Sequence, residues 1–224
     1  MSKRHDFYGP IHKGLRLGAA RLLIRLGAAD WRDAAAAHAL LDALALHLAL
    51  SKEHLEHEDA EILPALRVHA PWLAATLDHD HVEHYETFAA LDAAIAAVRA
   101  AAPQACADAA HALYLRYSRY FGEDLAHMER EENEAMPLFQ ALFSDAELMG
   151  METRIIAAIA PARLHAYYQL MLAGMAPAER AAFLRYVRDT APPEAYAQLL
   201  HQEARAALSP VEFALLREEL SDAA

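Results

Sequence analysis

Four long segments with helical spacing dominate the first 150 residues, and they constrain the fold more than any other feature of the sequence. Apolar residues recur every three or four positions in each segment, as on the buried face of an amphipathic helix. Prolines such as Pro71 and Pro103 stand at the boundaries, where they suit the first turn of a helix. The pattern predicts helices over residues 9–26, 33–66, 71–101 and 103–143.

The connections between these helices are short, so neighbouring helices are expected to run antiparallel. Only 7 of the 224 residues are glycine, and β-branched residues are sparse, which favours helix over strand. The sequence therefore predicts an all-α protein. It comprises an antiparallel up-down four-helix bundle over residues 1–148 and a helical C-terminal extension over residues 149–224.

The extension has a pattern of its own. We expect a helix over residues 152–173 and then three shorter helices, whose starts MAPAER, TAPPEAY and LSPVEF each place a glutamate just after a proline. Ser209 and Glu212 have the spacing of a capping box. His165 and His201 have no acidic residue at helical spacing, so packing or surface roles are expected. The extension is predicted to act in packing, homodimerisation or binding of a protein partner.

The chain is acidic, with a formal net charge of −12. An acidic protein repels phosphate backbones and anionic lipid, so neither nucleic acid nor membrane is an expected partner. The most apolar run, residues 34–50, is interrupted by His38, Asp42 and His47 and predicts a buried helix. The single Cys106 and a start unlike a secretory signal favour a cytoplasmic protein.

Histidine is unusually frequent: the chain has 14, of which 12 precede residue 150. With 32 acidic residues in 224, about two of these histidines should have an acid four positions later by chance, whereas five do. The five pairs are His38/Asp42, His54/Glu58, His57/Glu61, His79/Glu83 and His127/Glu131.

Two of these pairs belong to a repeated motif, HLEHEDAEILP (residues 54–64) and HMEREENEAMP (residues 127–137). Aligning the two histidines also aligns two glutamates and the final proline, whereas His57 is replaced by arginine. A histidine and a glutamate four residues apart lie on one helical face and can bind the same metal ion. The repeat therefore favours His54/Glu58 and His127/Glu131 as ligands.

The expected topology places further histidines at the same level. In an up-down bundle the start of the first and third helices and the end of the second and fourth share one end. At about 1.5 Å per residue, the depths of the candidate residues agree to within roughly two helical turns. The candidate metal ligands are His12, His54, Glu58, His81, His127 and Glu131.

This arrangement resembles the hemerythrin-like (HHE, cation-binding) family. The phrases IHKGLR, HLEHEDAEILPAL and HMEREENEAMPLF are similar to its first, second and fourth helix signatures, over residues 1 to about 145. The resemblance implies a four-helix bundle that encloses two carboxylate-bridged iron ions. It assigns His12, His54, His81 and His127 as terminal ligands and Glu58 and Glu131 as bridges. Spacing alone also admits zinc or manganese.

The third helix departs from the pattern of oxygen-carrying hemerythrins. In those proteins the corresponding helix is similar to the pattern HxxxH, with a second histidine four residues after the first. Here Tyr85 stands four residues after His81, and His84 stands three residues after His81. His84 and Tyr85 are therefore possible ligands, or residues that hydrogen-bond to the ligands or pack near the metal. His47 and Glu61 are expected to hydrogen-bond to ligands, and Tyr120 is expected to line an oxygen pocket. Reversible oxygen carriage is in doubt, because the ligand set contains fewer imidazoles.

These observations predict a non-haem diiron-binding protein that binds or responds to O2, NO or peroxide, or to iron itself. One alternative is a diiron enzyme of the peroxidase, oxidase or NO-reducing type. Another is a helical interaction module whose histidines are structural. A ferritin-like site is disfavoured, because no Glu-x-x-His motif occurs before residue 150.

Overall fold

The structure, a computed structural model, describes residues 4–221 of the 224-residue chain. These residues form helices joined by short connections, and no strand occurs among them. The predicted all-α class is therefore confirmed. The predicted domain ranges include residues 1–3 and 222–224, which lie outside the described residues.

The described part of the chain divides into two compact units. Unit 1 comprises residues 4–8 and 18–155, and unit 2 comprises residues 9–17 and 156–221. The boundary expected at residue 148 stays a prediction. The division runs through the first helix, so its two parts pack in different units.

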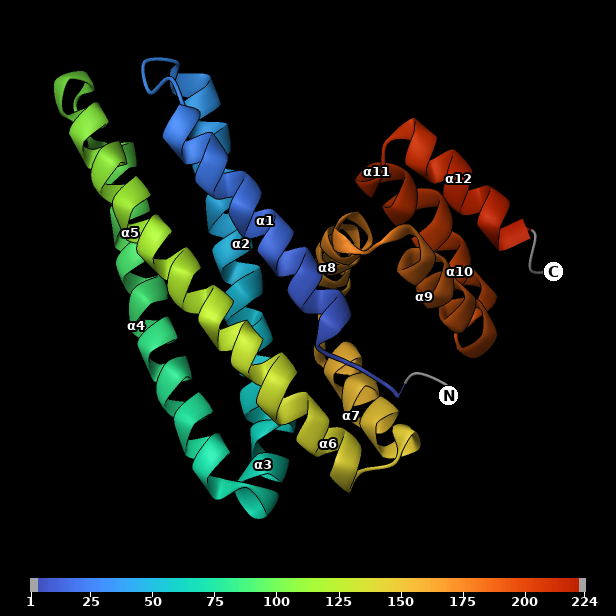
Figure 1. Cartoon of the computed structure of the whole chain (residues 1–224). Helices are drawn as coiled ribbons and strands as arrows, with labels where there is room; N and C mark the ends of the chain where they lie inside the picture. Colours follow the sequence, from blue (N-terminus) through green and yellow to red (C-terminus); the bar gives the residue numbers. More distant parts are fainter. Residues whose placement is uncertain (1–3, 222–224) are drawn as a thin grey trace. The chain divides into compact units, whose positions relative to one another are not determined.

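Unit 1 contains the long helices of the N-terminal region (Figure 1). They are the second part of α1 (Gly9–Ala28), α2 (Ala34–Glu61), α3 (Leu63–His69), α4 (Pro71–Ala100), α5 (Pro103–Arg130), a π-helical segment η1 (Glu131–Ala135), α6 (Met136–Leu142) and most of α7 (Asp145–Ala158). Asp33 caps α2 by accepting a hydrogen bond from the Ala36 N–H. Pro71 and Pro103 occupy the first turns of α4 and α5, as predicted.

A continuous apolar core fills unit 1 beside α2, α4 and α5, with the second part of α1 contributing to it. Its buried members recur at helical spacing, as in Leu40, Leu44 and Leu48 of α2 and Phe88, Leu91 and Ile95 of α4. Burial of apolar side chains stabilises each helix far more than its intrinsic propensity does. A second apolar cluster surrounds α3, α6 and the first turns of α4.

Two predicted helices are interrupted at the repeated prolines. The helix expected over residues 33–66 ends at Glu61, and α3 restarts with Pro64 in its first turn. The helix expected over residues 103–143 changes to π-helix at Glu131 and returns to α-helix beside Pro137. Proline has no N–H for the bond to the carbonyl four residues earlier, and its ring crowds that turn. The repeat thus distorts both helices just after their glutamates.

Unit 2 is built from shorter helices. They are α8 (Pro161–Gly174), α9 (Pro177–Thr190), α10 (Pro193–Gln198), a second π-helical segment η2 (Leu199–Ala204), α11 (Arg205–Ala207) and α12 (Pro210–Ser221), together with the first part of α1. The three predicted proline starts are confirmed, and Ser209 and Glu212 form the predicted capping box. The helix expected over residues 152–173 is instead two helices, because Pro161 begins a new one.

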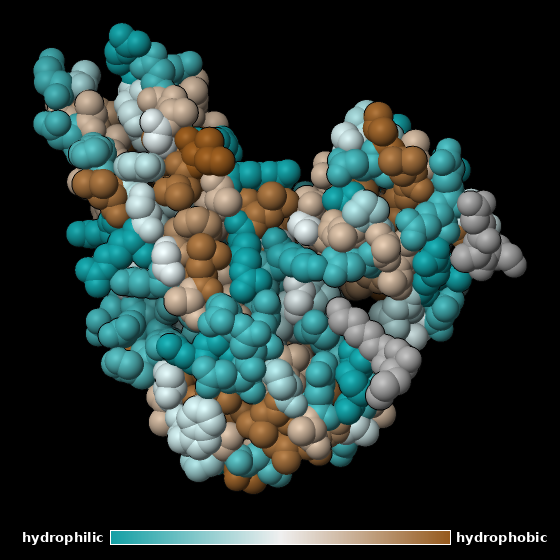
Figure 2. All heavy atoms as spheres, viewed as in Figure 1, coloured by the Kyte–Doolittle hydropathy of each residue, from teal (hydrophilic) through white to brown (hydrophobic). Residues whose placement is uncertain are grey.

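One helix, α2, is long and apolar enough to cross a membrane by length and composition. A core helix of a soluble protein passes the same test, and 39% of the apolar window of α2 is buried within the protein. Hydrophilic and hydrophobic residues are interspersed on the face shown in Figure 2. The expectation of a buried helix over residues 34–50 is compatible with these observations.

Unit 2 contains a close approach of two helix backbones, which yields a first prediction. A Cβ added at Gly174 would lie 2.6 Å from the carbonyl oxygen of Lys13, so alanine requires the backbones to move apart. Gly174→Ala is expected to destabilise the protein by about 1–3 kcal/mol, measured by urea unfolding. Gly122→Ala is the control, because a Cβ there meets no atom within 4 Å. Equal unfolding midpoints for Gly174→Ala and wild type would contradict the close approach.

Candidate metal centre

The end of α2 contributes one carboxyl to the interior of unit 1. Glu58 is 2% exposed. His54 lies one turn earlier on the same face, and its Nε2 is 3.1 Å from Glu58 Oε1. The predicted His54/Glu58 pair is therefore present as a side-chain contact.

Helix α4 contributes two buried imidazoles, His81 and His84. Nδ1 of His81 lies 2.7 Å from the carboxylate of Asp59, which follows Glu58 on α2. Nδ1 of His84 lies 2.7 Å from the backbone carbonyl oxygen of Asp80, one turn earlier on its own helix. Both imidazoles are thus held through the same ring nitrogen.

Helix α5 and the π-helical segment contribute the other half of the site. His127 lies in the last turn of α5, and Glu131 is the first residue of η1. Nδ1 of His127 is 3.4 Å from Asp80 Oδ2, which also accepts a hydrogen bond from Arg130. Single-turn π segments occur often at functional sites, and here the segment begins at a candidate ligand.

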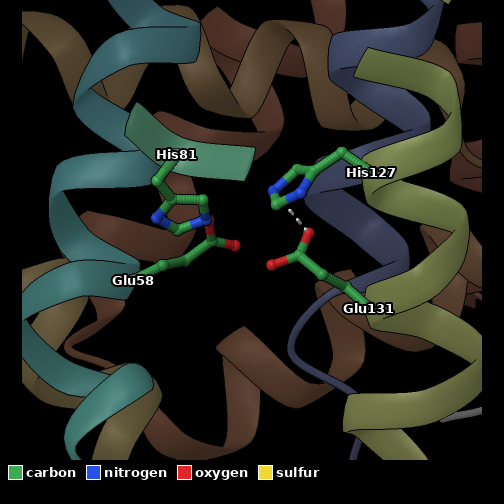
Figure 3. Close-up of side chains that lie close together, drawn as sticks. All are labelled: Glu58, His81, His127 and Glu131. Carbon is green, nitrogen blue, oxygen red and sulfur yellow. Dashed lines mark ion pairs between the residues drawn. The ribbon is translucent and has the colours of Figure 1, made fainter. Parts of the chain in front are cut away.

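Glu58, His81, His127 and Glu131 point toward one another in Figure 3. Each offers one potential ligand atom, and these four atoms lie within 4.8 Å of one another. The Nε2–carboxylate distances are 3.7 Å for His81 to Glu58 and 3.5 Å for His127 to Glu131. These distances exceed hydrogen-bond length. They are close to the roughly 3.4 Å that separates two ligands of a tetrahedral ion with bonds of about 2.1 Å.

The hydrogen bonds at Nδ1 determine which ring nitrogen carries the proton. A carboxylate and a backbone carbonyl only accept, so Nδ1 of His81, His84 and His127 must donate. In the neutral ring, Nε2 then carries a lone pair. All three Nε2 atoms are buried without a hydrogen-bond partner among the described residues. This is the arrangement of metal-ligating histidines, whose second nitrogen donates to a carboxylate or carbonyl.

Burial governs the protonation of the two glutamates. It raises the pKa of Glu58 well above its usual range, and the negative charge of Glu131 raises it further. Burial also raises the pKa of Glu131 strongly, although hydrogen bonds with Tyr8 and Glu58 act in the opposite direction. Both carboxyls therefore favour the protonated form unless a cation compensates their charge.

Burial has the opposite consequence for the imidazoles. It lowers the pKa of His127 to about 4 and also lowers that of His81. Burial alone would raise the pKa of Asp80, but hydrogen bonds from His127 and Arg130 lower it, so Asp80 stays a charged acceptor. Neutral imidazoles that present Nε2 lone pairs are the form that binds metal.

The buried polar groups of unit 1 include carboxyls and imidazoles, which are groups that bind a cation. Among the described residues of unit 1, no lysine or arginine is buried with the acidic groups and imidazoles. A buried carboxylate needs a partner of opposite charge. The buried groups are Glu58, Asp124, Glu131, His47, His81, His84 and His127. The residues therefore fit a metal ion bound by imidazole and carboxylate, as suits iron, zinc or manganese.

His12 is the one predicted ligand that lies outside unit 1. It is buried near the start of α1 and shares a helical face with Leu22 and Leu26, which belong to the core of unit 1. Because residues 9–17 belong to unit 2, the assignment of His12 to the metal site stays a prediction.

The other candidates have distinct environments. Tyr85 donates a hydrogen bond to Asp59 (2.6 Å), the residue that holds His81, and burial raises its pKa. Glu61, predicted to face the ligands, accepts a hydrogen bond from Arg154 (2.6 Å) instead, because α2 ends there. Tyr120 is fully buried, with its ring centroid 6.0 Å from that of His84. His47 is buried in the same unit.

Sequence reasoning missed the residues that hold the ligands. Asp59, Asp80, Asp124 and Tyr8 lie outside the two His–Glu pairs of the repeated motif. Tyr8 is fully buried and lowers the pKa of Glu131. The sequence does place two of these acids directly beside candidate ligands. Asp59 follows Glu58, and Asp80 precedes His81.

Comparison with protein-family models found no model that matches the chain, and comparisons with curated proteins and with solved structures found no similar protein. The similarity to hemerythrin-like proteins therefore depends on the motifs alone. The case for a metal site depends on the side-chain geometry.

The Asp59–His81 contact predicts an effect on metal affinity. Asp59→Asn removes the charged acceptor that holds Nδ1 of His81, and is expected to weaken Co²⁺ binding by about 10–100-fold. Titration followed by visible absorption measures the affinity. Asp42→Asn is the control, because Asp42 pairs with Arg99 at the surface of the same helix. Equal affinities of the two variants would contradict this role.

His47 predicts a dependence of stability on pH. Burial lowers its pKa to about 4 from a usual 6.5, so the unfolded chain binds this proton first as the pH falls. This contribution to the free energy of unfolding is present above pH 6.5 and falls by up to about 1.4 kcal/mol per pH unit toward pH 4. In His47→Leu, that part of the slope is expected to disappear in urea unfolding between pH 5 and 6 with chelator present. An unchanged slope would exclude it.

Proposed function

We propose that the protein is a hemerythrin-like non-haem iron protein, in which α1, α2, α4 and α5 form an antiparallel four-helix bundle around two iron ions. The single observation that carries the proposal is the orientation of the buried imidazoles. Three Nε2 atoms are directed toward buried carboxyls, and each Nδ1 is hydrogen-bonded to an acceptor.

Structural histidines alone account poorly for this arrangement. Buried polar atoms of a core normally have hydrogen-bond partners, and an unmade bond costs about 1–3 kcal/mol. Nε2 of His81 and of His127 instead lie opposite glutamate oxygens at 3.5–3.7 Å. A cation between nitrogen and oxygen removes this cost, so the geometry favours metal binding over an interaction module with structural histidines.

In the proposed site, His54, His81 and His127 would supply imidazole ligands, and Glu58 and Glu131 would supply carboxylate ligands. Bound iron would supply redox chemistry and a coordination position for a small ligand. Asp59 and Asp80 hold the imidazoles of His81 and His127 in the binding orientation. The apolar side chains around Phe88 and Leu91 limit access of water to the site.

We further propose that the natural ligand is O2, NO or peroxide, or that the protein responds to iron itself. Tyr85 supports a role other than oxygen carriage, because it replaces the second imidazole of the carrier pattern and hydrogen-bonds to Asp59. The acidic groups and the neutral imidazoles suit iron, and zinc or manganese could substitute. The cytoplasm remains the expected location.

Metal content tests the proposal. Wild-type protein loaded anaerobically with Fe²⁺ and desalted is expected to retain about two ions per chain. Glu131→Ala is expected to retain less than half of the wild-type content, because it removes a buried carboxylate ligand. Glu134→Ala is the matched control, since Glu134 is exposed in the same π-helical segment.

A wild-type protein that is folded and stable but retains no iron, manganese or zinc would refute the proposal and leave the interaction module. In a second stage, exposure of the iron-loaded protein to O2, NO and peroxide, followed by absorption spectroscopy, identifies the ligand. A stable, reversible O2 spectrum would indicate carriage, whereas rapid irreversible oxidation would indicate sensing or turnover.

A further inference from the structure

We infer that Asp124 and His84 form a third imidazole–carboxylate ligand pair of the metal centre, in addition to His81/Glu58 and His127/Glu131. The inference rests on the proposed metal-binding function and adds a carboxylate ligand that the repeated motif does not contain. Its basis is the placement of Asp124 on α5, the hydrogen bond at Nδ1 of His84 and the distance between Nε2 of His84 and Asp124 Oδ1.

Asp124 lies on the inward face of α5, almost one turn before His127. Residues three and seven apart share a helical face, so Asp124, His127 and Glu131 line the same side of the helix. Asp124 is 6% exposed, which is unusual for an aspartate.

The ring nitrogen of His84 that faces Asp124 is Nε2. Its Nδ1 must donate to the carbonyl oxygen of Asp80, so Nε2 of the neutral ring carries a lone pair. This Nε2 is buried without a hydrogen-bond partner in the part of the chain that the structure describes, and it lies 3.9 Å from Asp124 Oδ1. Two electron-pair donors face each other across a gap too long for a hydrogen bond. A cation can interact favourably with both atoms.

The ring of His84 belongs to the same cluster as the predicted ligands. Its centroid is 5.1 Å from that of His127, which in turn is 4.9 Å from that of His81. The three imidazoles, one from α5 and two from α4, therefore line one interior space. A ligand pair at His84 and Asp124 extends the centre toward Tyr120 without requiring a separate site.

Tyr120 lies beside the ring of His84. It is fully buried, and its ring centroid is 6.0 Å from that of His84. Burial raises the pKa of Tyr120 well above its usual range, so its hydroxyl stays protonated in this space.

A third carboxylate also bears on the number of ions. Glu58, Asp124 and Glu131 carry three negative charges when ionised, which is more than one divalent cation neutralises. With neutral imidazoles, two divalent cations and three carboxylates leave a net charge of about +1. One divalent cation would leave a net charge of about −1 instead, so the charge balance of the three carboxylates admits one ion or two.

Asp124→Asn tests the inference, with Co²⁺ as the probe. The amide keeps the size of the side chain but loses the charge. It is expected to weaken Co²⁺ binding at least about 10-fold and to change the visible absorption of the bound ion. Asp108→Asn, at an exposed position of the same helix, is the control and is expected to bind Co²⁺ as wild type does.

His84→Ala provides a second variant should Asp124→Asn fail to fold, and helical circular dichroism checks both. Because the two residues share an ion, the double variant is expected to lose less affinity than the sum of the two single losses. Wild-type affinity and an unchanged Co²⁺ spectrum in folded Asp124→Asn would overturn the inference and leave the proposed function intact. Absence of Co²⁺ and iron binding in wild type would instead overturn the proposed function.

Discussion

The interior of unit 1 depends on one electrostatic constraint: carboxyls and imidazoles are buried together without a lysine or arginine among the described buried residues of that unit. Burial raises the pKa of the glutamates and lowers the pKa of His81 and His127, so both kinds of group favour uncharged forms. The core can therefore fold with little buried charge. Metal binding would release carboxyl protons, which couples metal affinity to pH.

The imidazoles of His81 and His127 are held by side chains of neighbouring helices. Asp59 of α2 orients His81 of α4, and Asp80 of α4 orients His127 of α5. Tyr85 donates to Asp59, and Arg130 donates to Asp80, which keeps both acids in place. Each such contact fixes an axial offset between two helices as well as an imidazole. Preorganisation of this kind lowers the cost of ordering ligands when a cation binds.

Much of the fold could be predicted because the buried residues of a helix recur every three or four positions in the sequence. The apolar positions and the inward phase of Glu58, His81, His127 and Glu131 follow from steps of three and four residues. Glu61 has the same helical phase, but it is the last residue of α2 and its carboxylate accepts a hydrogen bond from Arg154. The interruptions near Pro64 and Pro137 do not follow from the apolar period. They arise because proline has no N–H for the helical hydrogen bond.

The sequence by itself determined the helical class, the proline starts and the presence of two His–Glu pairs on helical faces, since all of these depend on neighbours within about four residues. Only the tertiary structure decided which nitrogen of each imidazole faces the interior, because that depends on acceptors such as Asp59 and Asp80. It also paired His165 with Glu203, 38 residues apart, and grouped residues 9–17 with unit 2. The physical reason is that spacing along a chain specifies positions on one helix. Contacts between helices depend on crossing angles and offsets, which the packing of whole cores sets.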